Sequence, residues 1–127
     1  MLLMVDTSVL IDHLRGDARA VQRLRSAVLS GDELWSATVV RTEILAGARP
    51  GEAASISALL DQLQWMDITV DVADSAGRLA ARFLRSHSGV DTIDYLIAAC
   101  VQKLDARLLT LNVRHFPMFP DLEPAYR

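Results

Sequence analysis

The 127-residue sequence has little of several residue types, and each shortage excludes a class of protein. Cys100 is the only cysteine, so no internal disulfide can form, and no cysteine and histidine spacing suggests zinc. No apolar run reaches the roughly 18 residues that a membrane span requires. The apolar N-terminus is short, has no basic residue before it and meets Asp6 at once, unlike a signal peptide. We therefore expect a cytoplasmic protein without a membrane segment.

The charge balance excludes a broadly basic surface for nucleic acid. The net charge is −3, which is mildly acidic. Lys103 is the only lysine among 13 basic residues, so the others are arginines, whose planar groups bind phosphate through paired hydrogen bonds. A local phosphate-binding patch therefore remains compatible with the acidic total.

The apolar periodicity predicts one α/β domain over residues 1–127, with no repeat and no linker. Expected strands lie at 2–5, 33–37, 65–69 and 107–111, with a fifth, edge strand near 123–126. Expected helices lie at 8–14, 17–29, 38–48, 52–63, 71–87 and 92–104. Strands that alternate with helices predict a central, mainly parallel sheet of four to five strands.

Two carboxylates stand out against this pattern. Asp6 directly follows the first strand, and functional sites in parallel sheets form beyond the carboxyl ends of strands; a turn or a helix cap is the alternative. Glu43 lies on the apolar face of helix 38–48, where an unpaired charge is costly. It therefore either pairs with Arg41 or Arg78 or binds a metal ion.

A second acidic pair begins the helix at 92–104. Asp91 and Asp94 are three residues apart and share one face, a spacing that also suits a capping box. Asp94 borders the core positions Ile97 and Val101, so Asp91 is the better cap and Asp94 the better ligand. Acids that converge from these elements would repel one another, and an all-oxygen set favours Mg²⁺ or Mn²⁺.

Four stretches, VDTSVLID, VVRTEILAGA, DTIDYLIAAC and LLTLNVRHF, resemble the PIN domain in order and spacing, specifically the VapC-type toxins of toxin–antitoxin pairs. The resemblance implies a three-layer α/β/α sandwich and an Mg²⁺- or Mn²⁺-dependent endoribonuclease that cuts transfer, ribosomal or messenger RNA. It implies catalytic, metal-binding acids at Asp6, Glu43 and Asp94, a further candidate ligand at Asp91, and supporting polar residues at Ser8, Thr110 and Asn112. Many PIN domains carry a fourth acid where this chain has Asn112. The resemblance therefore does not decide whether protein groups hold a second metal ion.

The resemblance also implies partners. A VapB-type antitoxin would lie in a groove between the apolar helices 8–29 and 52–63, and a homodimer is typical of the family. Arg114 and His115, beside Asn112, are candidate RNA contacts. Arg15 is a further candidate, in a run with Arg19, Arg23 and Arg25 for which a solvated helix face is the alternative.

Three other functions fit the sequence less well. A receiver-type phosphotransfer domain needs a lysine after a late strand, and Lys103 precedes strand 107–111. A haloacid-dehalogenase-like phosphatase needs a second acid at Ser8. A catalytically degenerate PIN domain that only binds RNA or protein would lack an acid, and all three are present.

Overall fold

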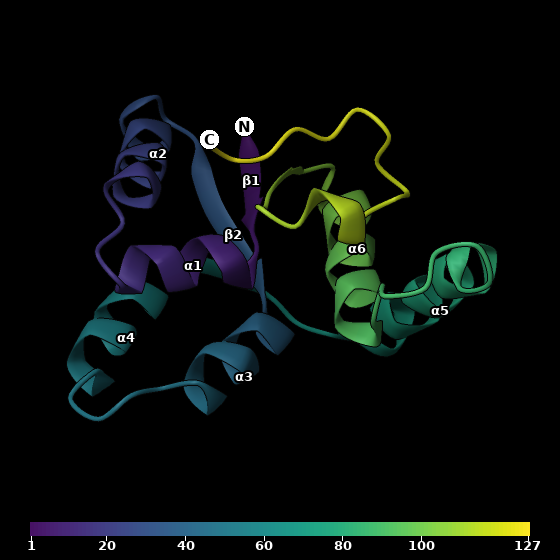
Figure 1. Ribbon diagram of the computed structural model, residues 1–127, viewed down its shortest axis with the longest axis horizontal. Helices are drawn as coiled ribbons and strands as arrows, with labels where there is room; N and C mark the ends of the chain where they lie inside the picture. Colours follow the sequence, from purple (N-terminus) through teal and green to yellow (C-terminus); the bar gives the residue numbers. More distant parts are fainter.

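A four-stranded, wholly parallel sheet forms the centre of the computed structural model, which describes residues 1–127 (Figure 1). Its strands are β1 (Leu2–Val5), β2 (Glu33–Ala37), β3 (Gln64–Met66) and β4 (Arg107–Leu109). The strand order is β3-β2-β1-β4, so β1 has a neighbour on each side. The predicted α/β fold with a parallel sheet is confirmed.

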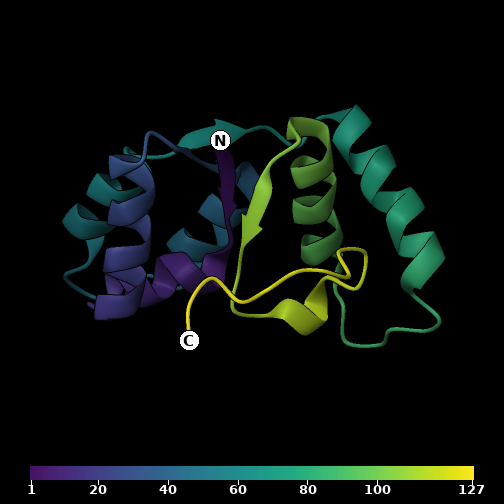
Figure 2. The same cartoon turned by 90° about the horizontal axis from the view of Figure 1, so that it is seen from above.

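Helices cover both faces of the sheet. They are α1 (Thr7–Leu14), α2 (Ala18–Leu29), α3 (Thr38–Ala46), α4 (Ala53–Leu60), α5 (Val70–Phe83) and α6 (Thr92–Leu104), followed by a 3₁₀ turn at Val113–His115. The first four lie on one side of the strands, and α5 and α6 lie on the other (Figures 1 and 2). This is the predicted three-layer α/β/α sandwich. No helix is long and apolar enough to cross a membrane.

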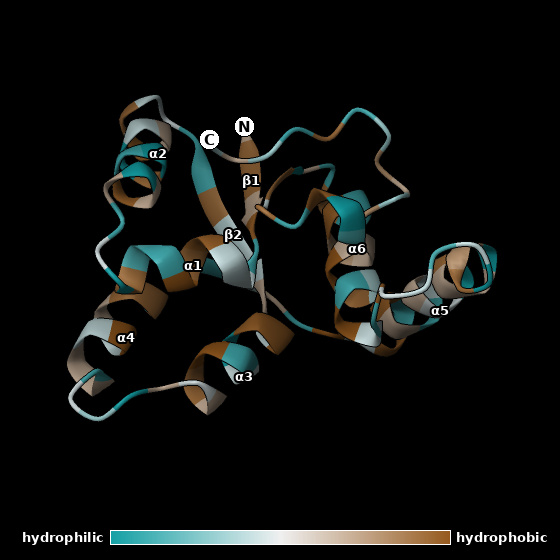
Figure 3. Ribbon diagram, in the orientation of Figure 1, coloured by the Kyte–Doolittle hydropathy of each residue, from teal (hydrophilic) through white to brown (hydrophobic).

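The central strand is buried because helices cover both of its faces. Leu3, Met4 and Val5 are all buried, and Figure 3 shows hydrophobic residues along β1. A strand enclosed on both faces needs a continuous apolar run rather than an alternating one, and the sequence LLMV has it. Such a strand is firmly placed, so it fixes the position of the residue that follows it.

The predicted fifth strand is wrong. Residues 123–126 form no strand, and Ala125 donates one backbone hydrogen bond to Thr110 O at 2.9 Å. Pro124 has no N–H to donate to a ladder, which explains why pairing does not extend along this segment. The tail instead ends with the Tyr126 hydroxyl, which donates to Asp12 Oδ2 at 2.7 Å.

Candidate active site

Asp6 is held by donors from the ends of two adjacent strands. It lies just after β1, caps α1 and is only 4% exposed. Its Oδ1 accepts a hydrogen bond from Thr7 N at 2.8 Å. Its Oδ2 accepts from Ser8 Oγ at 3.2 Å and from Thr110 Oγ1, which follows β4, at 2.6 Å. These bonds fix the orientation of the carboxylate.

The segment after β4 is tied to the segment after β1 by the same polar residues. Thr110 is fully buried, and its Oγ1 also accepts from Asn112 N at 3.0 Å. Ser8 Oγ accepts from Leu111 N at 3.1 Å. The structure thus brings Ser8 and Thr110 to Asp6. Asn112 lies beside them, and its side chain is exposed.

Glu43 makes neither of the two ion pairs considered from the sequence. Its Oε1 accepts a hydrogen bond from Thr7 Oγ1 at 2.6 Å. Arg41 instead lies over the ring of Trp65, with its Cζ 4.7 Å from the ring centroid, and Arg78 donates to Ser75 Oγ. Sequence reasoning missed Thr7; its position directly after Asp6 was the only signal that pointed to it.

Asp91 and Asp94 form the capping box predicted at the start of α6. Asp94 N donates to Asp91 Oδ1 at 3.1 Å, and Asp91 N donates to Asp94 Oδ2 at 3.2 Å. Asp94 is 8% exposed, and its Oδ2 also lies 3.3 Å from His115 Nδ1. Asp91 therefore caps the helix as predicted, and its role as a ligand stays a prediction.

The electrostatics of the site disfavour a charge on Asp94. The pKa of Asp94 is raised to about 6, chiefly by burial and also by the negative charges of Asp91 and Asp6, while the Asp91 backbone N–H and His115 act to lower it. Asp6 is thus near enough to Asp94 to repel it. A cation between these two carboxylates would remove the repulsion.

The donor set fits Mg²⁺ or Mn²⁺ in hydrated form. No group of three or more His, Cys, Asp or Glu side chains lies close enough to hold a metal ion by itself. Mg²⁺ in proteins keeps several waters and is usually held by only one or two carboxylates and by substrate phosphates. Asp6 and Asp94 supply such a pair, and Glu43 is joined to Asp6 through Thr7. Metal binding by these residues stays a prediction.

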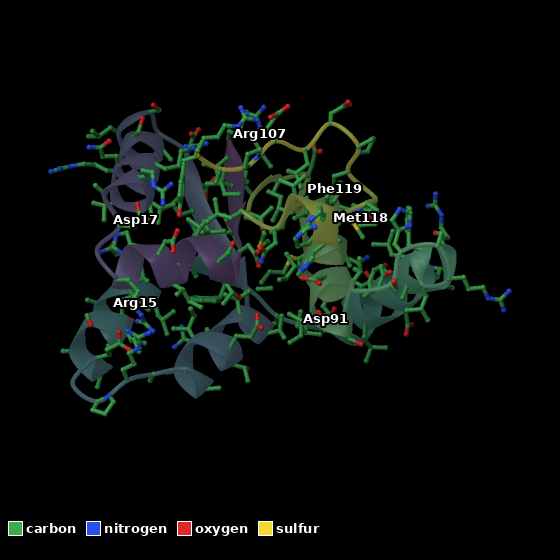
Figure 4. All side chains as sticks on the ribbon, viewed as in Figure 1. Arg15, Asp17, Asp91, Arg107, Met118 and Phe119 are labelled. Carbon is green, nitrogen blue, oxygen red and sulfur yellow. The ribbon has the colours of Figure 1, made fainter.

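The three candidate RNA contacts differ in position. His115 contacts Asp94, and Arg114 beside it is exposed. Arg15 forms an ion pair with Glu52, which joins the end of α1 to the start of α4. Figure 4 shows Arg15 well apart from Asp91, on the side of the site where it lines a small pocket together with Glu43.

Comparisons with known proteins identify the family of the chain. The PIN domain family matches residues 3–119. The chain is 47% identical over 123 residues to Ribonuclease VapC19 of Mycobacterium tuberculosis, covering 97% of this chain and 98% of that protein. It is 39% identical over 125 residues to Ribonuclease VapC10 of the same organism, covering 98% and 93%.

Solved structures share the fold at low sequence identity. VapBC2 from Rickettsia felis, bound to a promoter DNA fragment, matches with a TM-score of 0.82 and 19% identity over 96% of both chains. VapBC-1 from nontypeable Haemophilus influenzae matches with a TM-score of 0.79 and 21% identity over 98% of both chains.

Proposed function

Because the chain belongs to the PIN-domain family, we propose that it is a VapC-type endoribonuclease, the toxin of a toxin–antitoxin pair, that hydrolyses phosphodiester bonds in RNA with Mg²⁺ or Mn²⁺. One observation carries the proposal. In a chain 47% identical to a ribonuclease over nearly its whole length, two carboxylates are buried at helix starts, Asp6 after β1 and Asp94 in the first turn of α6, and the charge of Asp6 acts to raise the pKa of Asp94. Transfer, ribosomal and messenger RNA are the candidate substrates.

Each side chain of the site has a distinct role in this proposal. Asp6 and Asp94 hold the ion, Thr110 and Ser8 keep Asp6 oriented, and Asp91 fixes Asp94 through the capping box. When bound, the ion supplies a Lewis acid and lowers the pKa of its water.

Glu43 has one oxygen bonded to Thr7, so its other oxygen is available to bind the ion or to orient the attacking water. The amide of Asn112 contacts the phosphate from the strand end. Hydrolysis with these roles yields a 5′-phosphate and a 3′-hydroxyl.

Metal-dependent cleavage tests this function against a degenerate PIN domain that only binds RNA or protein. For the nuclease we expect RNA cleavage that stops in EDTA, returns with Mg²⁺ or Mn²⁺, and is absent from Asp6→Asn and Asp94→Asn. A protein that binds RNA without turnover under every metal condition would be the degenerate form.

The antitoxin site in this proposal is an apolar groove between α2 and α4 that encloses about 370 Å³. Seven of its ten lining residues are hydrophobic. Among them, Val28 is 57% and Leu29 is 81% exposed, which leaves apolar surface that a partner helix would bury. Arg25 also lines the groove, so an amphipathic VapB-type segment with acidic residues beside its apolar face would complement it.

Co-expression with a VapB-type antitoxin tests the groove. Val28→Asp places a charge in it and should abolish co-purification. Leu84→Asp makes the same kind of change at an exposed apolar residue at the end of α5, outside the groove, and should leave co-purification intact. Loss of the complex in both variants, or in neither, would remove the groove from the proposal.

The proposal also includes a single PIN domain over residues 1–127, a homodimer and a cytoplasmic location. Family resemblance supports all three. Sedimentation equilibrium of the purified chain distinguishes a dimer from a monomer of 14.0 kDa.

A further inference from the structure

A second hollow, called here the polar hollow because none of its lining residues is hydrophobic, lies next to His115, the residue that contacts Asp94. It encloses about 290 Å³ and is lined by Ser88 and Gly89, from the connection between α5 and α6, and by Arg114 and His115, from the 3₁₀ turn. None of these four residues is apolar or acidic. His115 belongs both to this polar hollow and to the active site, because its Nδ1 lies 3.3 Å from Asp94 Oδ2.

The polar groups of this hollow have few partners within the protein. Arg114 is exposed and forms no ion pair, and the Ser88 hydroxyl forms no hydrogen bond. His115 has one ring nitrogen at Asp94, which leaves Nε2 as the atom available to the hollow. A cation, a hydroxyl and an imidazole thus face one small space with no carboxylate among them.

We propose that the polar hollow binds a backbone phosphate of the RNA, next to the phosphate that is cleaved; this inference rests on the proposed function. The Arg114 guanidinium binds phosphate oxygens through paired, charge-assisted hydrogen bonds. The Ser88 hydroxyl is a further donor to phosphate, and no carboxylate lines the hollow to repel it. The ligand is therefore the sugar–phosphate backbone, which is the same for every RNA sequence.

Contact between His115 and Asp94 sets the position of this phosphate relative to the chemistry. A phosphate in the hollow lies against the same imidazole that contacts a carboxylate of the proposed metal site. Arg114 would thus hold the RNA on one side of the cleavage point. This contact would orient the RNA without dependence on its base sequence.

RNA binding by charge-matched variants tests the inference. All proteins carry Asp6→Asn to prevent cleavage. The probes are fluorescein-labelled 12-nucleotide oligouridylate and oligoadenylate. Each protein is titrated into each probe at several salt concentrations, and fluorescence anisotropy measures the binding. Arg114→Gln should weaken binding of both probes by about tenfold and lower the salt slope by about one. Arg107→Gln removes the same charge at the start of β4, far from Asp91 in Figure 4, and should change neither quantity.

Three results would overturn the inference: unchanged binding by Arg114→Gln, equal weakening by Arg107→Gln, or a loss for only one of the two probes. A Mn²⁺ titration of Arg114→Gln with Asp6 restored separates this failure from failure of the proposed function. If Arg114→Gln binds Mn²⁺ as tightly as the parent chain does, the proposed metal site is supported whatever the RNA result. Absence of Mn²⁺ binding in the parent chain itself would instead contradict the nuclease site.

Discussion

Thr7 Oγ1 donates a hydrogen bond of 2.6 Å to Glu43 Oε1, while the Thr7 backbone N–H donates to Asp6 Oδ1 at 2.8 Å. One residue thus binds two carboxylates from different elements, one at the end of β1 and one on α3. The first bond sets the rotamer of Glu43, and the second holds Asp6 in its capping position. Thr7 therefore fixes the spacing of two acids that the proposed chemistry uses together.

The first prediction concerns this hydroxyl. Thr7→Val keeps the shape and the backbone N–H but removes the donor to Glu43, so we expect Mn²⁺ affinity to fall by about tenfold. Thr7→Ser retains the hydroxyl and should restore the affinity of the parent chain, as measured by calorimetry. If the Mn²⁺ affinity of Thr7→Val equals that of the parent, or if Thr7→Ser loses as much affinity as Thr7→Val, the Thr7 hydroxyl does not position Glu43.

The second prediction concerns the stability cost of Asp94. Its pKa rises from an ordinary 3.8 to about 6 in the folded state, so between these values the folded chain binds more protons than the unfolded chain. Stability from this group is therefore present below pH 3.8 and is lost as the pH rises to about 6. Asp94→Asn removes the charge and keeps an oxygen that can accept from Asp91 N.

Metal-free Asp94→Asn should thus be more stable than the parent at pH 7, by about 1 kcal/mol after allowance for solvent screening, or about 4 °C in Tm. The two should melt alike near pH 4. Asp61→Asn, at the exposed end of α4, is the control and should show no such pH-dependent gain. A variant less stable than the parent at pH 7 would mean that Asp94 contributes to folding as an ion.

The third prediction compares two tyrosines. The Tyr95 hydroxyl is buried without a hydrogen-bond partner, whereas the Tyr126 hydroxyl donates to Asp12 Oδ2 at 2.7 Å. Tyr95→Phe should leave the free energy of unfolding unchanged or raise it by about 1 kcal/mol, and Tyr126→Phe should lower it by about 1 kcal/mol. Urea denaturation measures both. A loss in Tyr95→Phe as large as that in Tyr126→Phe would reveal a partner, such as a buried water, for the Tyr95 hydroxyl.

The parts of the fold that follow from local pattern were predictable from the sequence. The apolar run LLMV gave β1 at its observed residues, and the cap at Asp91 placed the start of α6 correctly. Parallel strands with intervening helices leave few arrangements, so Asp6 and Thr110 could be expected at one edge of the sheet. Both lie there, joined by a hydrogen bond.

Features that depend on tertiary contacts were not predictable. Whether Glu43 pairs with an arginine or with a hydroxyl depends on how α1 and α3 pack, and no sequence spacing encodes the contact with Thr7. Arg15 looks like part of a basic helix face, but Glu52 on a separate segment binds it. The predicted edge strand near 123–126 does not form, because Pro124 has no N–H to donate to a neighbouring strand.

A calorimetric Mn²⁺ titration of the chain and of Asp6→Asn tests the central claim, that this carboxylate cluster is a metal site, without knowledge of the RNA. We expect saturable binding by the parent chain and its loss in Asp6→Asn, with the folded state of the variant confirmed by a cooperative thermal transition. Equal binding by both proteins, or no binding by either, would contradict it, because Asp6 would then serve only to cap α1.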